Sequence, residues 1–169
     1  GAHLSIVMPI APGDGSREAK SALDKARMNP ISFIEISSLS NDHSWDLVID
    51  GLFGIGLTRP VQGEFRKLID YLNHLSCPTL AIDVPSGLNA DVGALVGPEG
   101  VAVKASATLT FIANKPGLHT LQGRDYAGTV MVDDLNIQRG LYGDPIGQLN
   151  RPELFCSALL PRAHASHKG

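Results

Sequence analysis

Two carboxylates follow apolar runs in this chain at points where a sheet strand would end. Asp50 closes the run Leu47–Ile49, and Asp83 closes the run Leu80–Ile82. A carboxylate at the end of a buried strand is partly desolvated, so it requires hydrogen-bond donors or a cation. Because the carboxyl ends of parallel strands meet at one edge of an open sheet, we expect both acids to face a common crevice.

A glycine-rich turn directly follows Asp50 and contains Gly54 and Gly56, then Arg59. Glycines let backbone amides approach a ligand closely, and an arginine can pair with a phosphate in a bidentate fashion. The full dinucleotide pattern is not present, since Arg59 stands where the third glycine would be. Two interpretations remain open: Asp50 is a ligand of a metal or substrate, or it caps the amides of its own turn.

The segment Asp83–Gly87 reads Asp-Val-Pro-Ser-Gly and offers a carboxylate beside a hydroxyl. Asp83 could act as a general acid or base, or bind a ribose or an amide, while Ser86 could serve a cation. The glycine spacing of a nucleophile elbow is absent, and we expect His43 and His74 to be solvated or bonded locally. A serine hydrolase is therefore disfavoured.

A lysine, Lys115, comes just after another apolar run, Thr108–Ala113. From the end of that predicted strand its ammonium could reach the same crevice as the two acids. The plainer interpretation is a solvated loop lysine.

Strands alternate with helices along the chain, which predicts a Rossmann-like α/β three-layer sandwich, with a mainly parallel sheet and helices on both faces. Residues 1–139 are expected to form this domain, and residues 140–169, where the pattern decays, a linker or tail. The Gly, Asp and Asn content of Leu88–Pro98 predicts a long surface loop. The predicted helices are Arg17–Met28, with Ser16 as N-cap, and Glu64–Leu75; the predicted strands are Leu4–Met8, Ile31–Ile36, Leu47–Ile49, Thr79–Ile82, Thr108–Ala113 and Thr129–Val132.

Composition excludes several classes of protein. With 169 residues, 43% hydrophobic and 18% charged, the chain is typical of one globular domain. A net charge of -3 without a basic block argues against nucleic acid as a partner, and no apolar run is long enough to span a bilayer. Cys77 and Cys156 form no metal or redox motif, and we expect them to be small buried residues of a reduced, cytoplasmic protein.

Four motifs in order resemble the NAD(P)H-hydrate epimerase family, the YjeF N-terminal domain. They are DLVIDGLFGIGLTRPVQGEF from Asp46, LAIDVPSGLNADVG from Leu80, GVAVKASATLTFIANKPGL from Gly100 and GRDYAGTVMVDDLNI from Gly123. The final residues, LLPRAHASHKG, resemble the opening of the ADP- or ATP-dependent dehydratase domain that follows in bifunctional repair enzymes.

The resemblance implies an enzyme that interconverts the R and S forms of NAD(P)H hydrated at C6 of the nicotinamide ring. It implies a potassium (K+) cofactor held by Asp50 and Ser86, and a homodimer. Asp83 is the first candidate for the catalytic acid or base, and Lys115 the second. Contacts to the hydrated nucleotide are implied for Asp83 and for the turn residues Gly54, Ile55, Gly56, Leu57, Thr58, Arg59 and Pro60.

One departure from the family concerns an upstream loop. The family carries a Gly-Asn-Asn-Gly-Gly-Asp-Gly loop between its first strand and helix, which binds phosphate and supplies an asparagine ligand to potassium. This chain has no such loop, and Leu4–Met8 resembles the family's second strand. We therefore expect the first strand and its loop to lie outside this chain or to be lost. A catalytically silent Rossmann-like module for a nucleotide or protein partner is the alternative function.

Overall fold

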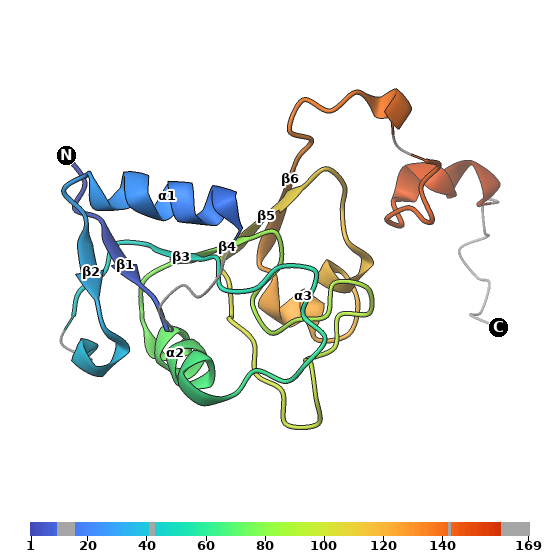
Figure 1. Ribbon diagram of the computed structural model, residues 1–169. Helices are drawn as coiled ribbons and strands as arrows, with labels where there is room; N and C mark the ends of the chain where they lie inside the picture. The colour runs from blue at the N-terminus through green and yellow to red at the C-terminus, as the bar shows by residue number, and fades with distance from the viewer. Residues whose placement is uncertain (10–15, 41–42, 142, 160–169) are drawn as a thin grey trace. The chain divides into compact units, whose positions relative to one another are not determined.

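The computed structural model describes residues 1–9, 16–40, 43–141 and 143–159 (Figure 1). The chain forms two compact units, Gly1–Asn136 and Ile137–Gly169. All the helices and strands predicted from the sequence are present, with ends shifted by up to two residues. The first unit holds β1 (Ser5–Val7), α1 (Arg17–Arg27), β2 (Ser32–Ile34), β3 (Val48–Asp50), α2 (Gly63–His74), β4 (Thr79–Ile82), β5 (Ala107–Phe111), α3 (Gly123–Tyr126) and β6 (Thr129–Asp133).

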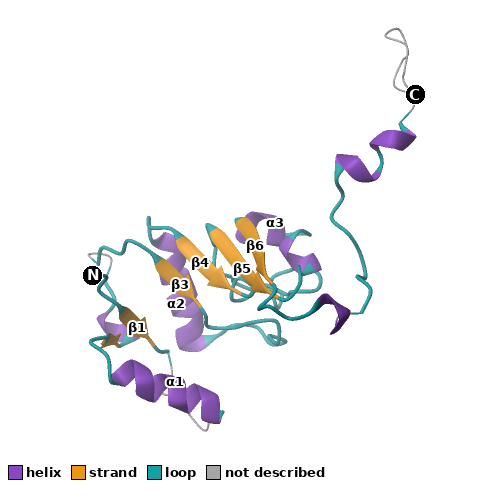
Figure 2. Ribbon diagram, turned by 90° about the horizontal axis from the view of Figure 1, so that it is seen from above, coloured by secondary structure: helices purple, strands orange, loops and turns teal. Residues whose placement is uncertain are grey.

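Every strand pair is parallel, which confirms the α/β prediction. The strands lie in two sheets rather than one: β1 pairs with β2, and the second sheet has the order β3-β4-β5-β6. Figure 2 shows these four strands side by side and pointing the same way. The register pairs Asp50 with Ala81 and Ile82 with Leu109, so β3, β4 and β5 end close together at one edge of the sheet.

Helix α2 follows the glycine turn and connects β3 to β4. Glu64 lies in its first turn, where the helix dipole favours an acid, and Leu68 and Ile69 are its buried residues. The helix gives way to extended backbone at Leu75, three residues before Pro78. In α1, the predicted N-cap Ser16 accepts a hydrogen bond from the amide of Ala19, 3.2 Å long.

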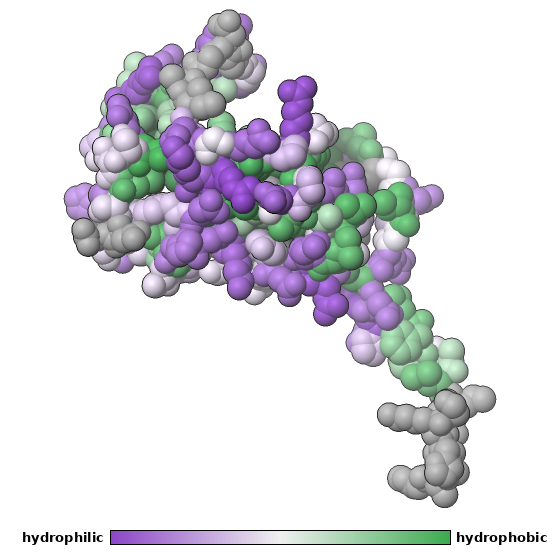
Figure 3. Space-filling view, turned by 90° about the horizontal axis from the view of Figure 1, so that it is seen from below, coloured by the Kyte–Doolittle hydropathy of each residue, from purple (hydrophilic) through white to green (hydrophobic). Residues whose placement is uncertain are grey.

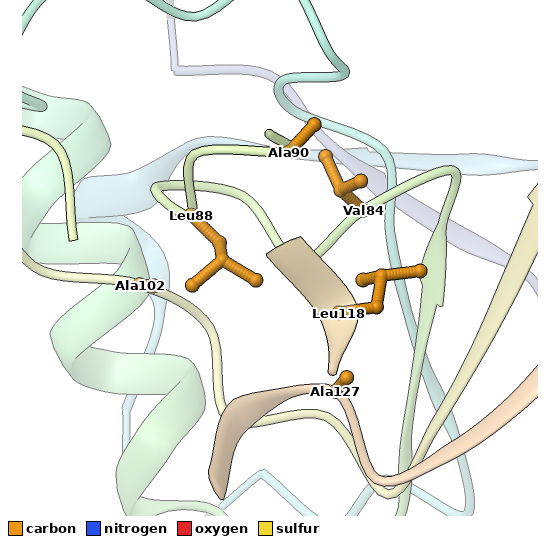
Figure 4. Close-up of a cluster of buried hydrophobic side chains, with 6 residues drawn as sticks. All are labelled: Val84, Leu88, Ala90, Ala102, Leu118 and Ala127. Carbon is orange, nitrogen blue, oxygen red and sulfur yellow. The ribbon is translucent and has the colours of Figure 1, made fainter. Parts of the chain in front are cut away.

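Two apolar clusters support the carboxyl edge of the four-stranded sheet. One joins Val61, Ile69 and Val103. The other draws its side chains from the segment after β4, the segment before β5 and the connection from β5 to β6 (Figure 4). Its members are Val84, Leu88, Ala90, Ala102, Leu118 and Ala127. The predicted surface loop Leu88–Pro98 is thus partly a core segment, since Leu88 and Ala90 are buried.

The second unit has only short 3-10 turns among its described residues, at Arg139–Leu141, Pro152–Leu154 and Cys156–Ala158. Its described apolar side chains after Ile137 are exposed, Ile146 by 96%, and Figure 3 shows apolar residues next to the grey end of the chain. The dehydratase-like motif falls largely on residues 160–169, outside the described residues. The prediction of buried cysteines is wrong for Cys156, which is exposed, because this segment forms no core; Cys77 is half-buried. None of the helices described is both long and apolar enough to cross a membrane.

Candidate functional site

Asp50 ends β3 and lies almost fully buried, with 1% of its surface exposed. The hydroxyl of Ser86 donates to Oδ1 at 2.6 Å, and the Ser86 amide donates to Oδ2 at 2.8 Å. The Leu52 amide donates to Oδ1 at 3.3 Å. Burial raises the pKa of the Asp50 carboxyl, and the hydrogen bonds from Ser86 and Leu52 oppose that rise. Asp50 therefore caps its own turn and also ties it to the segment that follows β4.

Ser86 joins the two segments from the other side. Its side chain is fully buried, and its Oγ accepts a hydrogen bond from the Phe53 amide at 2.9 Å while it donates to Asp50. Its carbonyl accepts from the Val103 amide at 2.9 Å. Among the described residues, no histidine bonds to Ser86. His43 is bonded within its own loop and His74 to its own helix, as expected.

Asp83 lies just past the end of β4 and pairs with Lys115. The Lys115 Nζ lies 3.0 Å from Asp83 Oδ1 and donates to the Phe111 carbonyl at 2.6 Å. The other oxygen, Oδ2, accepts a hydrogen bond from the Ile55 amide at 3.2 Å. The two side chains are 20% and 17% exposed, so the pair is partly shielded but open to a ligand. Lys115 is thus not a freely solvated loop lysine.

A cavity of ≈ 370 Å³ opens over the glycine turn. Its lining contains five of the seven turn residues predicted to contact a substrate. Of the other two, Ile55 is 62% exposed and bonds Asp83 through its amide, and Pro60 lies against Gly97. The lining residues are Leu52, Phe53, Gly54, Gly56, Leu57, Thr58 and Arg59.

Several donors of this turn have no partner within the described part of the chain. They are the amides of Gly54 and Gly56 and the guanidinium of Arg59. Asp83 adjoins the same turn, because a Cβ on Gly54 would lie 3.0 Å from its Oδ2. The structure thus brings a carboxylate, an ammonium and unpaired donors to one edge of the sheet.

The two acids meet the same turn at different depths. Asp50 accepts a hydrogen bond from the Leu52 amide directly and is linked to the Phe53 amide through Ser86. Asp83 accepts one from the Ile55 amide. Sequence reasoning missed the backbone groups that complete the site, namely the Phe53 and Ile55 amides and the Phe111 carbonyl. No side-chain pattern marks such groups, since every residue type supplies them.

The chain resembles known proteins in sequence and in fold. It is 53% identical over 89 residues to the NAD(P)H-hydrate epimerase of Limosilactobacillus fermentum, which covers 53% of this chain and 41% of that protein. It is 37% identical over 146 residues to the bifunctional NAD(P)H-hydrate repair enzyme Nnr of Escherichia coli, which covers 86% of this chain and 28% of that protein. The chain therefore spans less than half the length of these two relatives.

The crystal structure of yeast ynu0, YNL200c, superimposes with a TM-score of 0.63 at 16% identity, over 80% of this chain and 56% of that one. This likeness supports the α/β fold alone. The family model described as "YjeF-related protein N-terminus" matches residues 1–117, well over half of the sequence. The chain belongs to the YjeF-related protein N-terminus family.

Proposed function

We propose that this chain supplies the catalytic site of an NAD(P)H-hydrate epimerase, which interconverts the R and S forms of hydrated NAD(P)H. Family membership and the names of the bacterial relatives support the reaction. The observation that carries the proposal for this chain is the Asp83–Lys115 pair, 3.0 Å apart and beside the glycine turn. An acid and a base in contact beside a turn that lines a cavity can hold and exchange a proton.

Inversion at C6 needs both a proton donor and a proton acceptor. The carbon bears a hydroxyl next to the ring nitrogen, so inversion can proceed by loss and return of water or by opening and closing of the ring. In the first route the leaving hydroxyl takes a proton, and the water that adds to the opposite face gives one up. Asp83 is the first candidate for this exchange and Lys115 the second; both routes place the same demand on them.

The glycine turn suits the charged part of a nucleotide. Its unpaired amides at Gly54 and Gly56 can donate to phosphate or ribose oxygens, and the exposed Arg59 can pair with a phosphate. No large basic patch is needed, since these donors act locally. We propose Gly54, Gly56, Leu57, Thr58 and Arg59 as direct substrate contacts, with Ile55 acting mainly through Asp83 and Pro60 through the packing of the turn.

We propose potassium as the cofactor, held by Asp50 and Ser86. The donor set fits, because both residues offer oxygen and the buried Asp50 carboxylate has no cationic side chain as a partner in the described ranges. A bound potassium ion would neutralise Asp50 and fix the turn near a substrate phosphate, without taking part in proton transfer. Unfolding temperature measured in KCl and in choline chloride tests this proposal independently of turnover: the wild type should gain stability in KCl and Asp50→Asn should not.

The wider assembly is proposed from the name of the bifunctional relative and, for the dimer and the compartment, from the sequence resemblance. We propose that residues 140–169 form a linker to a dehydratase domain, as the bifunctional E. coli relative suggests, and that the epimerase part forms a homodimer in the cytoplasm. The second unit leaves apolar side chains exposed, which is expected of a segment that buries them only by packing against another domain. Size-exclusion chromatography with light scattering measures the oligomeric state.

The decisive experiment compares Asp83→Asn with Asp91→Asn in an assay that follows S-hydrate formation from purified R-hydrate. General acid–base catalysis contributes about 10²- to 10⁴-fold, so Asp83→Asn should lower the rate by that order while folding is retained. Asp91 is an exposed loop acid, and its variant should keep the wild-type rate. Wild-type turnover in Asp83→Asn would remove Asp83 from catalysis.

The alternative is a silent nucleotide-binding module. The unpaired donors of the glycine turn suit nucleotide binding whether or not catalysis follows, so they are compatible with this alternative as well. A wild-type chain that binds NADPH in calorimetry, with no epimerisation above the uncatalysed rate, would support this alternative.

A further inference from the structure

The two central strands of the sheet end in the same unusual turn. After β4, the Val84 amide donates to the Ile82 carbonyl at 3.0 Å across Asp83, whose φ is 71°. After β5, the Ala113 amide donates to the Phe111 carbonyl at 2.7 Å across Ile112, whose φ is 68°. Hydrogen bonds two residues apart around a positive φ define a rare and strained γ-turn.

The residue types make both turns costly. Non-glycine residues seldom adopt a positive φ, and a β-branched isoleucine is among the least tolerant. Such conformations are costly and persist only where the surroundings impose them. The side chain of Ile112 does not explain its backbone, because it is 42% exposed and belongs to neither apolar cluster.

Both turns act on one ammonium group. The turn at Asp83 presents that residue's carboxylate to Lys115 Nζ at 3.0 Å. The turn at Ile112 presents the Phe111 carbonyl to the same nitrogen at 2.6 Å. The Ile112 amide donates to the Asp133 carbonyl at 2.7 Å, which anchors the second turn to β6. The ammonium therefore lies between two oxygens whose directions are set by paired γ-turns.

We propose that Ile112 is a positioning residue, which fixes the Lys115 ammonium against Asp83 through the Phe111 carbonyl. A Cβ at position 112 excludes much of the backbone space that glycine would reach, so the turn, anchored to β6 by the Ile112 amide, is kept in one geometry. The catalytic consequence rests on the proposed epimerase function. The positioning itself does not depend on turnover.

The test is Ile112→Gly, with Leu121→Gly as the matched control. Leu121 also has a positive φ, of 42°, and is 65% exposed, and no hydrogen bond among the described residues joins it to Lys115. Lysine acetylation by a limiting reagent, followed by mass spectrometry, reports how firmly Lys115 is held relative to the exposed Lys104. We expect Lys115 to be acetylated about three- to ten-fold faster in Ile112→Gly and at the wild-type rate in Leu121→Gly, since a charge-assisted bond is loosened in the first alone.

A second variant separates backbone geometry from loss of the side chain. Asparagine accepts a positive φ more readily than other non-glycine residues, so Ile112→Asn should keep Lys115 protected. In the epimerase assay, Ile112→Gly should lower kcat about ten-fold with KM changed less than two-fold, because the turn is not a substrate contact.

Wild-type acetylation of Lys115 in a folded Ile112→Gly protein would overturn the proposal. Loss of protection in a folded Ile112→Asn protein would overturn it too, since side-chain packing would then be the cause. An inactive wild type with the expected acetylation pattern would leave the positioning supported and refute the epimerase function instead.

Discussion

Removal of one hydroxyl, by Ser86→Ala, should destabilise this protein far more than the size of the change suggests. The Ser86 Oγ donates to Asp50 at 2.6 Å and accepts from the Phe53 amide at 2.9 Å. Both Ser86 and Asp50 are almost completely buried, so water cannot replace either bond without a rearrangement. The hydroxyl thus shares with the Ser86 amide the task of tying the end of β3 to the segment after β4.

The magnitude follows from those two bonds. A hydrogen bond to a charged group contributes about 1.5–3 kcal/mol, and a backbone amide left without a partner in a partly buried place costs about 1–2 kcal/mol. Asp50 keeps its bond from the Ser86 amide, so the carboxylate loses one hydrogen bond rather than all of them. We expect Ser86→Ala to lower the free energy of unfolding by about 3 kcal/mol, a large share of the stability of a domain of this size.

The measurement is equilibrium unfolding in urea, with Ser106→Ala as the control. Ser106 is exposed, and its Oγ accepts one bond, from the Thr79 amide at 3.2 Å, so that variant should lose about 1 kcal/mol or less. Equal losses in the two variants would falsify the reasoning, because the buried charged bond would then contribute nothing beyond a neutral exposed one.

Three further predictions concern Asp50, Thr110 and Gly54. Burial raises the pKa of Asp50, so folding favours its protonated form. The contribution of that carboxyl to the free energy of unfolding is complete below its ordinary pKa of 3.8 and is lost as pH rises through the folded pKa. Urea unfolding at a series of pH values should show this loss in the wild type and not in Asp50→Asn, and parallel profiles would refute it. Thr110 Oγ1 is a buried side-chain oxygen without a partner in the described structure, so Thr110→Val should raise stability by about 1 kcal/mol. Thr108→Val on the same strand should lower stability by about the same amount, because it loses the 2.7 Å bond to the Ala127 carbonyl. Thermal unfolding of both variants tests whether the two changes have opposite signs. A Cβ at Gly54 would lie 3.0 Å from Asp83 Oδ2, so Gly54→Ala should displace that carboxylate and lower the epimerase rate about ten-fold, while Gly51→Ala, with open space around its Cβ, should keep the wild-type rate; equal rates in steady-state assays would show that Asp83 tolerates the contact.

Much of the fold could be predicted because its signals are local. Helix α2 carries apolar residues at helical spacing, and β4 is an apolar run after a proline. The division of the strands into two sheets could not be predicted, since strand pairing depends on which edges meet in space. The partial burial of Leu88–Pro98 could not be predicted from the sequence either. Its glycines indicate a loop, yet Gly93 lets the chain approach the Thr120 carbonyl so closely that a Cβ would lie 2.2 Å from it.

The candidate site likewise has parts that the sequence predicts and parts that it does not. Strand-end acids at Asp50 and Asp83 could be found from the sequence, because an acid directly after an apolar run is visible in the letters. Their direct hydrogen bonds could not be read from the spacing, since Ser86 lies 36 residues from Asp50, and Ile55 28 residues from Asp83; the family resemblance alone grouped Asp50 with Ser86. The pairing of Lys115 with Asp83 likewise depends on the turn after β5, whose positive φ at Ile112 no sequence rule predicts for an isoleucine.

Asp50 and Asp83 lie at different depths, so we expect Asp50 to act on stability and Asp83 on catalysis. The two effects are coupled, because both acids contact the same glycine turn. Asp50, 1% exposed, cannot meet a substrate directly, whereas the Asp83 side chain is 20% exposed. Their contacts on the glycine turn, at Phe53 through Ser86 and at Ile55, are two residues apart. Ser86→Ala should therefore also lower the rate of the proposed epimerase reaction in the absence of denaturant, because a loosened Phe53 amide lets the Ile55 amide move away from Asp83. A folded Ser86→Ala protein with full turnover would show that the two acids act independently.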